Sequence, residues 1–443
     1  MDSSSSASQS MRERNIDAII NYFERGCKRQ QNGKLGIEIE HFIIDRNDGK
    51  SVDYYGSNGV ESLLESLAET YSIKKYSRGH LIALSDGNKC EISLEPAAQL
   101  EVSLGMYSKI VEFKTEYSKF RKVIDPILEK HNYALITTGY RPNSRVDDLN
   151  LIPKLRYELM DKYFRGLGGY GPNMMRSTAA TQVSIDYYCE TDFKKKFRLA
   201  NILTPLFAIL MDGENVFEGE HGKTMVRTLV WDSVDTDRSG FACGALDNIN
   251  FGFKDYAEYV YDRPSIMALD TSQEFKYTDS TPTNQVYGEV LMSDLDITHV
   301  LSMFFPYVRL KNFIEIRMAD SMSIEYTLGF AALIKGLFYS QKNLTALLKI
   351  YEDIKTKDAI DAFDVLKEYG LDGTIYGKNV STQLCEIISL ASDGLTKGEK
   401  HYLKPLYKLA TNTKRGALQV DDSKKQFEIG DKFKQYGYEN CDR

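Results

Sequence analysis

Glutamates recur at even spacing in short strand-like segments of this 443-residue chain. Glu38 and Glu40 alternate with isoleucines in one segment, and Glu91 and Glu95 lie four residues apart in a second. Because a strand directs residues i and i+2 to one face, each segment gathers its carboxylates on one side. Close carboxylates repel one another unless a cation is bound, so the pattern predicts a carboxylate-lined cavity that holds Mg²⁺ or Mn²⁺. For each segment alone, an exposed edge strand is the alternative.

The second acidic segment belongs to a β-rich stretch, residues 82–102, which we expect to form two strands around a turn at Ser85–Asn88. Pro96 interrupts the second strand and permits a bend that turns its polar face around a cavity. Gln99 and Glu101 continue that polar face. An ordinary polar edge remains an equal alternative here.

A third segment places five residues on one strand face: Arg309, Lys311, Phe313, Glu315 and Arg317. An arginine two residues from a metal-binding glutamate could hold a phosphate whose charge the metal also offsets. The alternative is an internal salt bridge between Glu315 and Arg317.

A fourth segment, residues 225–240, contains the only tryptophan of the chain, Trp231. Arg227 in the same segment offers a two-pronged donor for a carboxylate, and Trp231 could form the wall of a small-molecule pocket. Equally open is a structural interpretation, in which Trp231 belongs to the core and the charged residues form a loop network.

Composition excludes several classes of protein. The formal net charge of −7 gives no general basic field, which argues against a nucleic-acid binder. No apolar stretch reaches the ~18 residues that cross a bilayer, and the Ser-rich start lacks the apolar core of a signal peptide. The six cysteines are scattered without CxxC spacing, so neither a disulfide scaffold nor a zinc ribbon is indicated. We therefore expect a cytoplasmic protein.

Helical and strand-like segments alternate without the rhythm of a parallel sheet, which predicts an α+β fold with a mainly antiparallel sheet. We expect a flexible tail over residues 1–10 and a catalytic domain over residues 11–330. Residues 331–443 are predicted to form a helical C-terminal layer that packs on the same domain.

Taken together, the segments resemble the plant-type branch of the glutamate-cysteine ligase family, a branch that also occurs in many bacteria. Seven phrases match in family order: GIEIEHF (36–42), ISLEPAAQLE (92–101), LRYELM (155–160), MMRSTAATQVSID (174–186), RTLVWDSVDTDRSG (227–240), FGFKDYAEYVYDRP (251–264) and FPYVRLKNFIEIRMAD (305–320). The resemblance implies a glutamine synthetase-like fold, in which an antiparallel sheet curls into a funnel surrounded by helices.

The resemblance also implies the chemistry. Family members use ATP and Mg²⁺ to phosphorylate the γ-carboxylate of glutamate, and the amine of cysteine then displaces phosphate to give γ-glutamylcysteine. By the same resemblance, Arg317 would hold the transferring phosphate, and Arg156, Arg227 and Trp231 would bind the amino acids. The implied metal shell consists of Glu38, Glu40, Glu95, Glu101, Gln182 and Glu315, although some other branches carry a histidine at the place of Gln182.

Three rival interpretations remain at this stage. A ligase of the same fold could join glutamate to another amine, because a few side chains in a pocket can change the acceptor. A phosphotransferase related to the guanidine kinases would share an acidic sheet but form no amide bond. A catalytically silent paralogue would have lost metal carboxylates, which are intact here. We expect a monomer or a homodimer.

Overall fold

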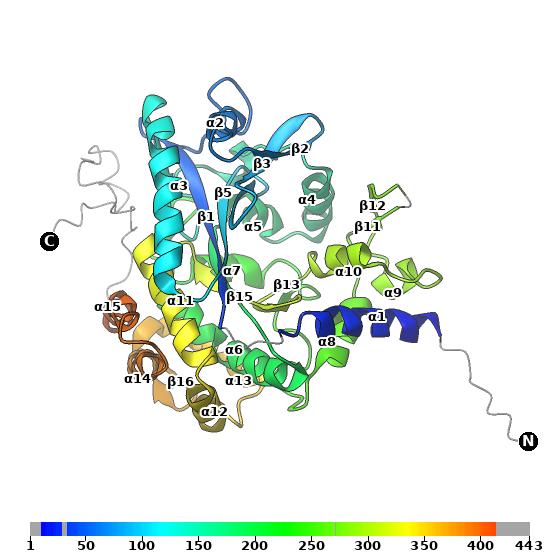
Figure 1. Ribbon diagram of the computed structural model, residues 1–443, viewed down its shortest axis with the longest axis vertical. Coiled ribbons are helices and arrows are strands. Elements are labelled where there is room, and N and C mark those ends of the chain that lie inside the picture. The colour runs from blue at the N-terminus through cyan, green and yellow to red at the C-terminus, as the bar shows by residue number, and fades with distance from the viewer. Residues whose placement is uncertain (1–9, 29–32, 271, 413–443) are drawn as a thin grey trace, which may run out of the picture.

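The computed structural model describes residues 10–28, 33–270 and 272–412. Its centre is one nine-stranded sheet in which every pair of neighbouring strands is antiparallel (Figure 1). The strand order is β14-β15-β7-β1-β5-β4-β3-β2, and β6 also pairs with β1. The strands are β1 (Leu35–Asp45), β2 (Ile73–Ser77), β3 (His80–Ser85), β4 (Cys90–Leu94), β5 (Leu100–Tyr107), β6 (Tyr133–Ile136), β7 (Ala180–Ile185), β14 (Val308–Leu310) and β15 (Ile314–Asp320).

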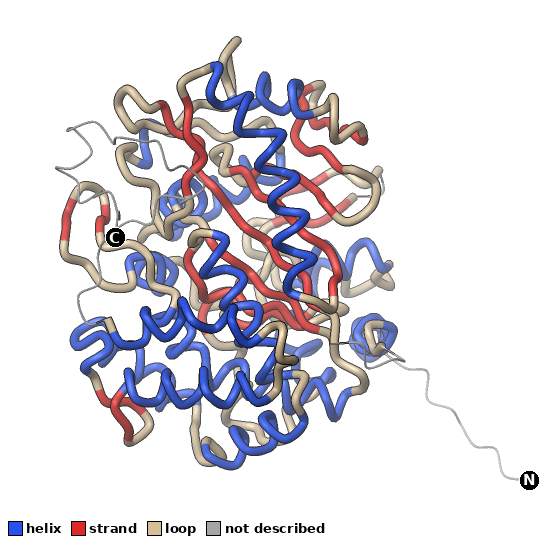
Figure 2. The backbone as a smooth tube through the Cα atoms, turned by 60° about the vertical axis from the view of Figure 1, so that its left-hand side comes forward, coloured by secondary structure: helices blue, strands red, loops and turns tan. Residues whose placement is uncertain are grey.

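Helices surround this sheet, and the long α3 lies across it in Figure 2. On the same side α11 contacts α3, β1 and β7, while α6 contacts β15. The helices are α1 (Met11–Arg25), α2 (Val60–Leu67), α3 (Ile110–Lys130), α4 (Leu155–Leu167), α5 (Gly171–Ser177), α6 (Glu190–Leu210), α7 (Val226–Asp232), α8 (Phe253–Tyr261), α9 (Thr283–Val286), α10 (Asp294–Leu301), α11 (Ile324–Phe338), α12 (Gln341–Ile350), α13 (Thr356–Tyr369), α14 (Val380–Asp393) and α15 (Lys404–Thr411).

Short elements complete the chain. Four two-stranded pairs lie outside the large sheet: β8 (Val216–Phe217) with β9 (Glu220–His221), β10 (Ser239–Gly240) with β13 (Phe305–Pro306), β11 (Met267–Leu269) with β12 (Phe275–Tyr277), and β16 (Thr374–Ile375) with β17 (Lys378–Asn379). Three 3₁₀ turns cover Val146–Asp148, Gly370–Asp372 and Lys400–Leu403. No helix of the described residues is both long and apolar enough to cross a bilayer.

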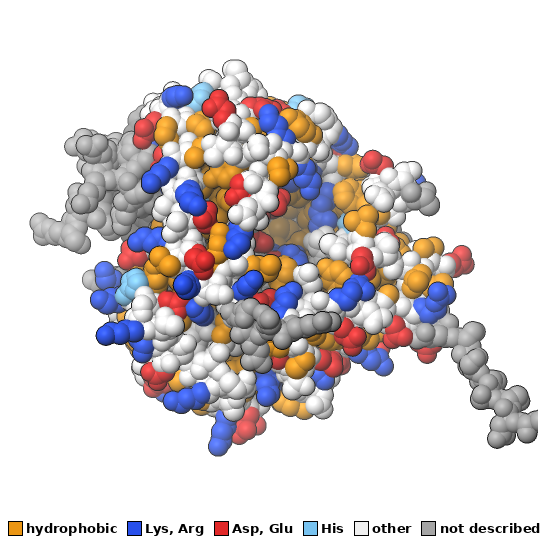
Figure 3. All heavy atoms as spheres, viewed as in Figure 1, with side chains coloured by type: hydrophobic (Ala, Val, Ile, Leu, Met, Phe, Trp, Pro, Cys, Tyr) orange, Lys and Arg blue, Asp and Glu red, His pale blue; other side chains and the backbone are white. Residues whose placement is uncertain are grey.

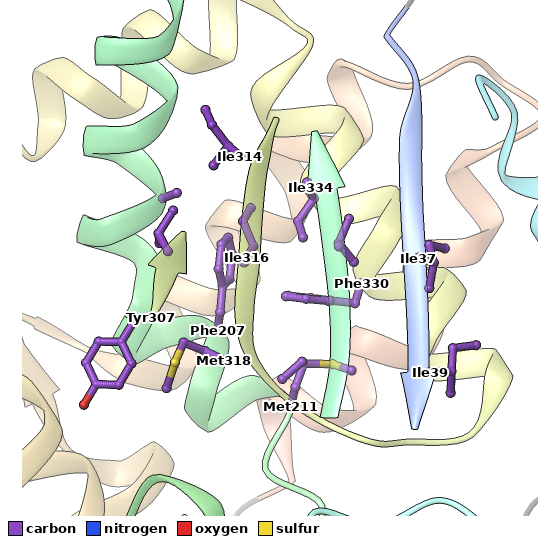
Figure 4. Close-up of a cluster of buried hydrophobic side chains, with 14 of the residues drawn as sticks. Ile37, Ile39, Phe207, Met211, Tyr307, Ile314, Ile316, Met318, Phe330 and Ile334 are labelled. Atoms are coloured by element: carbon purple, nitrogen blue, oxygen red, sulfur yellow. The ribbon is translucent and has the colours of Figure 1, made fainter. Parts of the chain in front are cut away.

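The alternation of isoleucines and glutamates in the sequence gives the sheet one apolar face and one polar face. Ile37 and Ile39 of β1 and Ile316 of β15 are at most 1% exposed. Figure 4 shows these side chains in the apolar layer that also contains Phe207 of α6 and Phe330 of α11. Burying this face against helices leaves the other face for the polar residues between the isoleucines, which is the arrangement that the period of two predicts.

The α+β class with a mainly antiparallel sheet is confirmed. The stretch of residues 82–102 differs in detail, because Pro96 lies in the turn that joins β4 to β5 instead of interrupting one strand. In this β-hairpin Ser93 faces Glu101. Since proline has no N–H to give to a ladder, a turn is the place where it costs nothing.

Two features of the structure bear on the predicted domain limits. The predicted tail at residues 1–10 lies outside the described residues except for Ser10, whose side chain caps α1. Helix α11 runs without a break across residues 330 and 331, where the helical layer was predicted to begin.

Candidate active site

A cavity of about 440 Å³ opens on the polar side of the sheet. Figure 3 shows a hollow in this face, in the region between β1 and α4 of Figure 1, where basic and hydrophobic side chains gather. Nine of the predicted site residues line the cavity: Glu38, Glu40, Glu95, Glu101, Arg156, Gln182, Arg227, Trp231 and Arg317. The tenth, Glu315, is fully buried and contacts Arg317 behind the wall. The structure therefore brings together residues that lie up to 279 positions apart in the sequence.

One wall of the cavity is acidic, because neighbouring strands align their glutamates. Glu40 of β1 faces Glu101 of β5, and Glu95 follows directly after β4. Burial and the nearby carboxylates raise the pKa of Glu38 and of Glu40 to about 8 and that of Glu101 to about 7. Burial also raises the pKa of Glu95. Ionising all four carboxyl groups at once is unfavourable because the resulting negative charges repel one another. A bound cation would offset this repulsion.

The donor chemistry of this wall fits an oxygen-seeking divalent cation such as Mg²⁺. Glu40 accepts 2.8 Å hydrogen bonds from the Ala180 N–H and from the Gln182 amide, while Ser93 and Ser103 donate to Glu101 at 3.0 and 3.2 Å. Within the described part of the chain, no three acidic, histidine or cysteine side chains form a ready-made ligand set. The glutamates therefore offer the right atoms without a preformed cage.

We expect the thermal stability of the ligand-free protein to fall between pH 6.5 and pH 8. A glutamate whose folded pKa is raised stabilises the protein while it is protonated, and that contribution is lost as the pH rises through the folded pKa. Glu38, Glu40 and Glu101 titrate in this window. The buried His41 and His299, with pKa values lowered to about 3 and about 4, act only below their unfolded value near 6.5. The expected loss is about 2 kcal/mol.

Scanning calorimetry at several pH values measures this loss. Glu40→Gln should flatten the curve, because the amide does not titrate. MgCl₂ should raise the thermal midpoint more at pH 8 than at pH 6.5, because deprotonated carboxylates bind the cation more tightly. A midpoint that rises steadily from pH 6.5 to pH 8 would contradict the raised pKa values.

The opposite wall is built around Glu315, whose carboxylate binds three basic side chains. Arg309 donates to its two oxygens at 2.6 and 3.0 Å, Lys311 at 3.2 Å and Arg317 at 3.0 Å. These cations hold the pKa of Glu315 well below its usual range despite complete burial. The alternative salt bridge between Glu315 and Arg317 is thus present. Glu315 therefore accepts four hydrogen bonds and anchors three cations. This anchoring role is an alternative to its predicted role as a metal ligand.

Arg317 lies in a β-bulge of β15. Ile316 pairs with Val183 and Ala319 with Thr181, so β15 carries one extra residue between these pairs. A bulge of this kind bends the strand and re-aims its side chains, and bulges are frequent beside active sites. The isoleucines before the bulge and Glu315 keep the alternation that the sequence predicts.

Gln182 joins the acidic and basic walls. Its amide nitrogen donates to Glu40 at 2.8 Å, and its amide oxygen accepts a 2.7 Å hydrogen bond from Arg317. The side chain is 5% exposed, so both bonds are shielded from water. The predicted metal role of Gln182 stays a prediction, and the structure adds a direct link between Glu40 and Arg317.

Arg227 and Trp231 lie on α7, and both carry unpaired polar atoms. Arg227 is 4% exposed, and its guanidinium has no hydrogen-bond acceptor among the residues described. Burial lowers its pKa, while Asp320 and Glu40 favour its charged form. The Trp231 indole N–H is likewise buried without a partner. An unpaired buried guanidinium in a cavity wall is costly unless an anion binds there.

Arg156, unlike Arg227, donates hydrogen bonds to the protein. The Ser302 hydroxyl and carbonyl oxygens accept its hydrogen bonds at 2.9 and 2.8 Å, and Ser302 follows directly after α10. Burial lowers the pKa of Arg156. The arginine therefore faces the cavity in a fixed orientation.

Sequence reasoning assigned no role to several cavity residues. Arg309 and Lys311 were placed on the correct strand face, and their contacts with Glu315 give them roles that spacing alone did not reveal. The apolar wall includes Met174 and Met175 of α5. Gly171 and Pro172 begin this helix.

Comparison with known protein families gives one match. The model of glutamate-cysteine ligase family 2 matches residues 34–422. This range contains all strands of the large sheet and every residue of the cavity described above.

Curated relatives and a solved structure agree with that match. A chloroplastic glutamate–cysteine ligase of Arabidopsis thaliana is 28% identical over 392 residues, which cover 86% of this chain and 73% of the relative. The corresponding protein of Medicago truncatula is 27% identical over 86% of this chain and 75% of the relative. A crystal structure of the glutamate–cysteine ligase gshA from Francisella tularensis in complex with AMP has a TM-score of 0.54. At 11% identity over 86% of this chain and 83% of that chain, it supports the fold.

Proposed function

The chain belongs to glutamate-cysteine ligase family 2, and from this membership we propose that it joins the γ-carboxylate of glutamate to the amine of cysteine at the expense of ATP. The observation that carries the proposal is the division of the cavity into an acidic wall and a basic wall, with the unpaired Arg227 between them. Phosphoryl transfer to a carboxylate brings anions together, and a site of this composition can bind them side by side.

The reaction takes two steps. A γ-carboxylate oxygen of glutamate attacks the terminal phosphorus of ATP, ADP leaves, and γ-glutamyl phosphate forms. The amine nitrogen of cysteine then attacks the acyl carbon, phosphate leaves with the bonding electrons, and the nitrogen loses a proton. The product is γ-glutamylcysteine.

The residues of this chain orient and neutralise the reactants. Arg317 donates to the transferring phosphoryl group, and Glu315 with Gln182 holds its guanidinium in place. Arg227 receives a substrate carboxylate beside the Trp231 ring, and Arg156 supplies a second basic group. Fixing the donors before the reaction lowers the cost of bringing charge together in the transition state.

Glu38, Glu40, Glu95 and Glu101 would hold Mg²⁺ or Mn²⁺. When bound, the cation supplies positive charge that offsets the repulsion between the nucleotide and the carboxylate. The raised pKa values of Glu38, Glu40 and Glu101 support the assignment, because a bound cation would favour their ionised forms.

We expect glutamate-dependent ADP release with cysteine to exceed release with any other amine in a panel of amino acids, polyamines and ammonia. A coupled assay measures ADP, and mass spectrometry of the product identifies the amide. Equal turnover with several amines would overturn the cysteine assignment while leaving the ligase chemistry intact. A phosphorylated guanidine product without an amide bond would instead indicate a phosphotransferase.

A further inference from the structure

We infer that Lys311 and Arg317 together bind the diphosphate of the nucleotide, with Arg309 serving only to hold Glu315. This inference rests on the proposed use of ATP. The cluster around Glu315 contains three cations, and the hydrogen bonds of each show which of them remain available for a ligand.

Arg309 is the cation of this cluster that the protein engages most fully. Its Nε and one Nη bind the two oxygens of Glu315, and its other Nη donates to the Phe304 carbonyl at 3.0 Å. All three nitrogens of the guanidinium are therefore engaged by the protein. Arg309 is a positioning residue that neutralises Glu315.

Lys311 and Arg317 have donors left over. The Lys311 ammonium makes one hydrogen bond, to Glu315 at 3.2 Å, so two of its N–H groups lack an acceptor among residues 33–270 and 272–412. Arg317 uses a single nitrogen for both Gln182 and Glu315, which leaves its Nε and second Nη without a protein acceptor in that part of the chain. Both side chains line the cavity.

The two residues differ in depth. The Lys311 side chain is 26% exposed and that of Arg317 is 10% exposed, so the free donors extend from the rim of the cavity inward. An extended anion with several phosphate groups contacts both positions at once.

The surroundings of Lys311 favour a polyphosphate that carries a cation. Burial raises the pKa of Glu38 and Glu101, and Lys311 opposes that rise, which places its ammonium within electrostatic reach of both carboxylates. The ionised forms of these glutamates would repel an anion bound by Lys311 alone. A phosphate chain with a divalent cation satisfies both walls, because the phosphates face the lysine and the cation faces the glutamates.

The amino-acid carboxylates have a better site elsewhere. Arg227 lies deeper, at 4% exposure, and its guanidinium has no protein acceptor in the described structure. Its pKa is influenced by Asp320, Glu40 and Arg317, so Arg227 lies near Arg317 in the same cavity. A carboxylate bound by Arg227 would therefore lie beside phosphates bound by Arg317 and Lys311, as phosphoryl transfer to that carboxylate requires.

The test is calorimetric titration of Lys311→Met with ADP, AMP and glutamate, each in the presence of MgCl₂. Losing charge-assisted hydrogen bonds to phosphate should raise the Kd for ADP by about 10- to 100-fold. The Kd for AMP, which lacks the β-phosphate, and that for glutamate should change by less than about threefold. Lys311→Arg should restore most of the ADP affinity.

Lys74→Met is a matched control, since Lys74 is also a partly exposed lysine paired with a glutamate, 2.6 Å away, on a strand outside the cavity. The control should leave all three affinities unchanged. An unchanged ADP affinity in Lys311→Met, or a loss that falls on glutamate instead, overturns the inference. Wild-type protein that binds ADP through Lys311 but forms no γ-glutamyl amide would instead contradict the proposed ligase activity alone.

Discussion

Replacing Glu315 with glutamine is expected to abolish glutamate-dependent ADP release, with kcat lowered by roughly 100-fold or more. Among the described residues, this carboxylate is the one acidic group that binds Arg309, Lys311 and Arg317 directly. An amide carries no charge and offers one acceptor oxygen where the carboxylate offers two. The three cations would then repel one another, and Arg317 would lose the orientation that directs it to the phosphoryl group.

Steady-state kinetics with cysteine and glutamate measures the effect, and Glu91→Gln provides the control. Glu91 is an exposed glutamate on β4, so its loss should leave kcat unchanged. Electron paramagnetic resonance with Mn²⁺ separates the two roles of Glu315, because an anchoring residue leaves cation affinity nearly intact whereas a metal ligand does not. Full activity in Glu315→Gln would remove the residue from both roles.

The second large effect is expected for Arg227→Met, which should lower kcat/KM for an amino-acid substrate by roughly 100- to 1,000-fold. The same change should leave the thermal midpoint of the ligand-free protein unchanged or raise it. The reason is that Arg227 is buried without a hydrogen-bond partner in the described structure, so replacing it with an apolar side chain of similar length removes a desolvated charge. Function and stability then change in opposite directions.

Arg141→Met is the matched comparison. Arg141 is also buried, at 2% exposure, but it donates to Ser51, Ala97 and the Arg176 carbonyl and lies outside the cavity. Removing it leaves buried acceptors unsatisfied and should lower the thermal midpoint. If Arg227→Met proved as destabilising as Arg141→Met, Arg227 would be a structural residue and not a substrate ligand.

The period of two in the sequence was sufficient to predict the faces of the sheet. It placed the isoleucines of β1 in the core and Glu38 with Glu40 on the polar side, because alternation depends only on local backbone geometry. It also placed Glu315 and Arg317 together. The family resemblance then supplied roles for residues on helices, such as Arg227, that no strand pattern could address.

Other features depend on contacts between distant segments and were not predictable in this way. The bulge in β15 is defined by its pairing with β7, and the hydrogen bonds of Glu315 are set by how β14 and β15 meet. The link that Gln182 makes between Glu40 and Arg317 joins three strands. Such arrangements are fixed by packing, so spacing along the chain does not reveal them.

The central position of β1 has a consequence for how the protein is made. This strand pairs with β5, β6 and β7, and β15 joins the sheet on the far side of β7. The active site therefore needs residues from Glu38 to Arg317. Contacts of such long sequence separation form slowly, because the chain must first close large loops. A ribosome must therefore release the chain as far as Arg317 before any catalytic cavity exists, and until then β7 lacks its β15 neighbour and exposes an open edge.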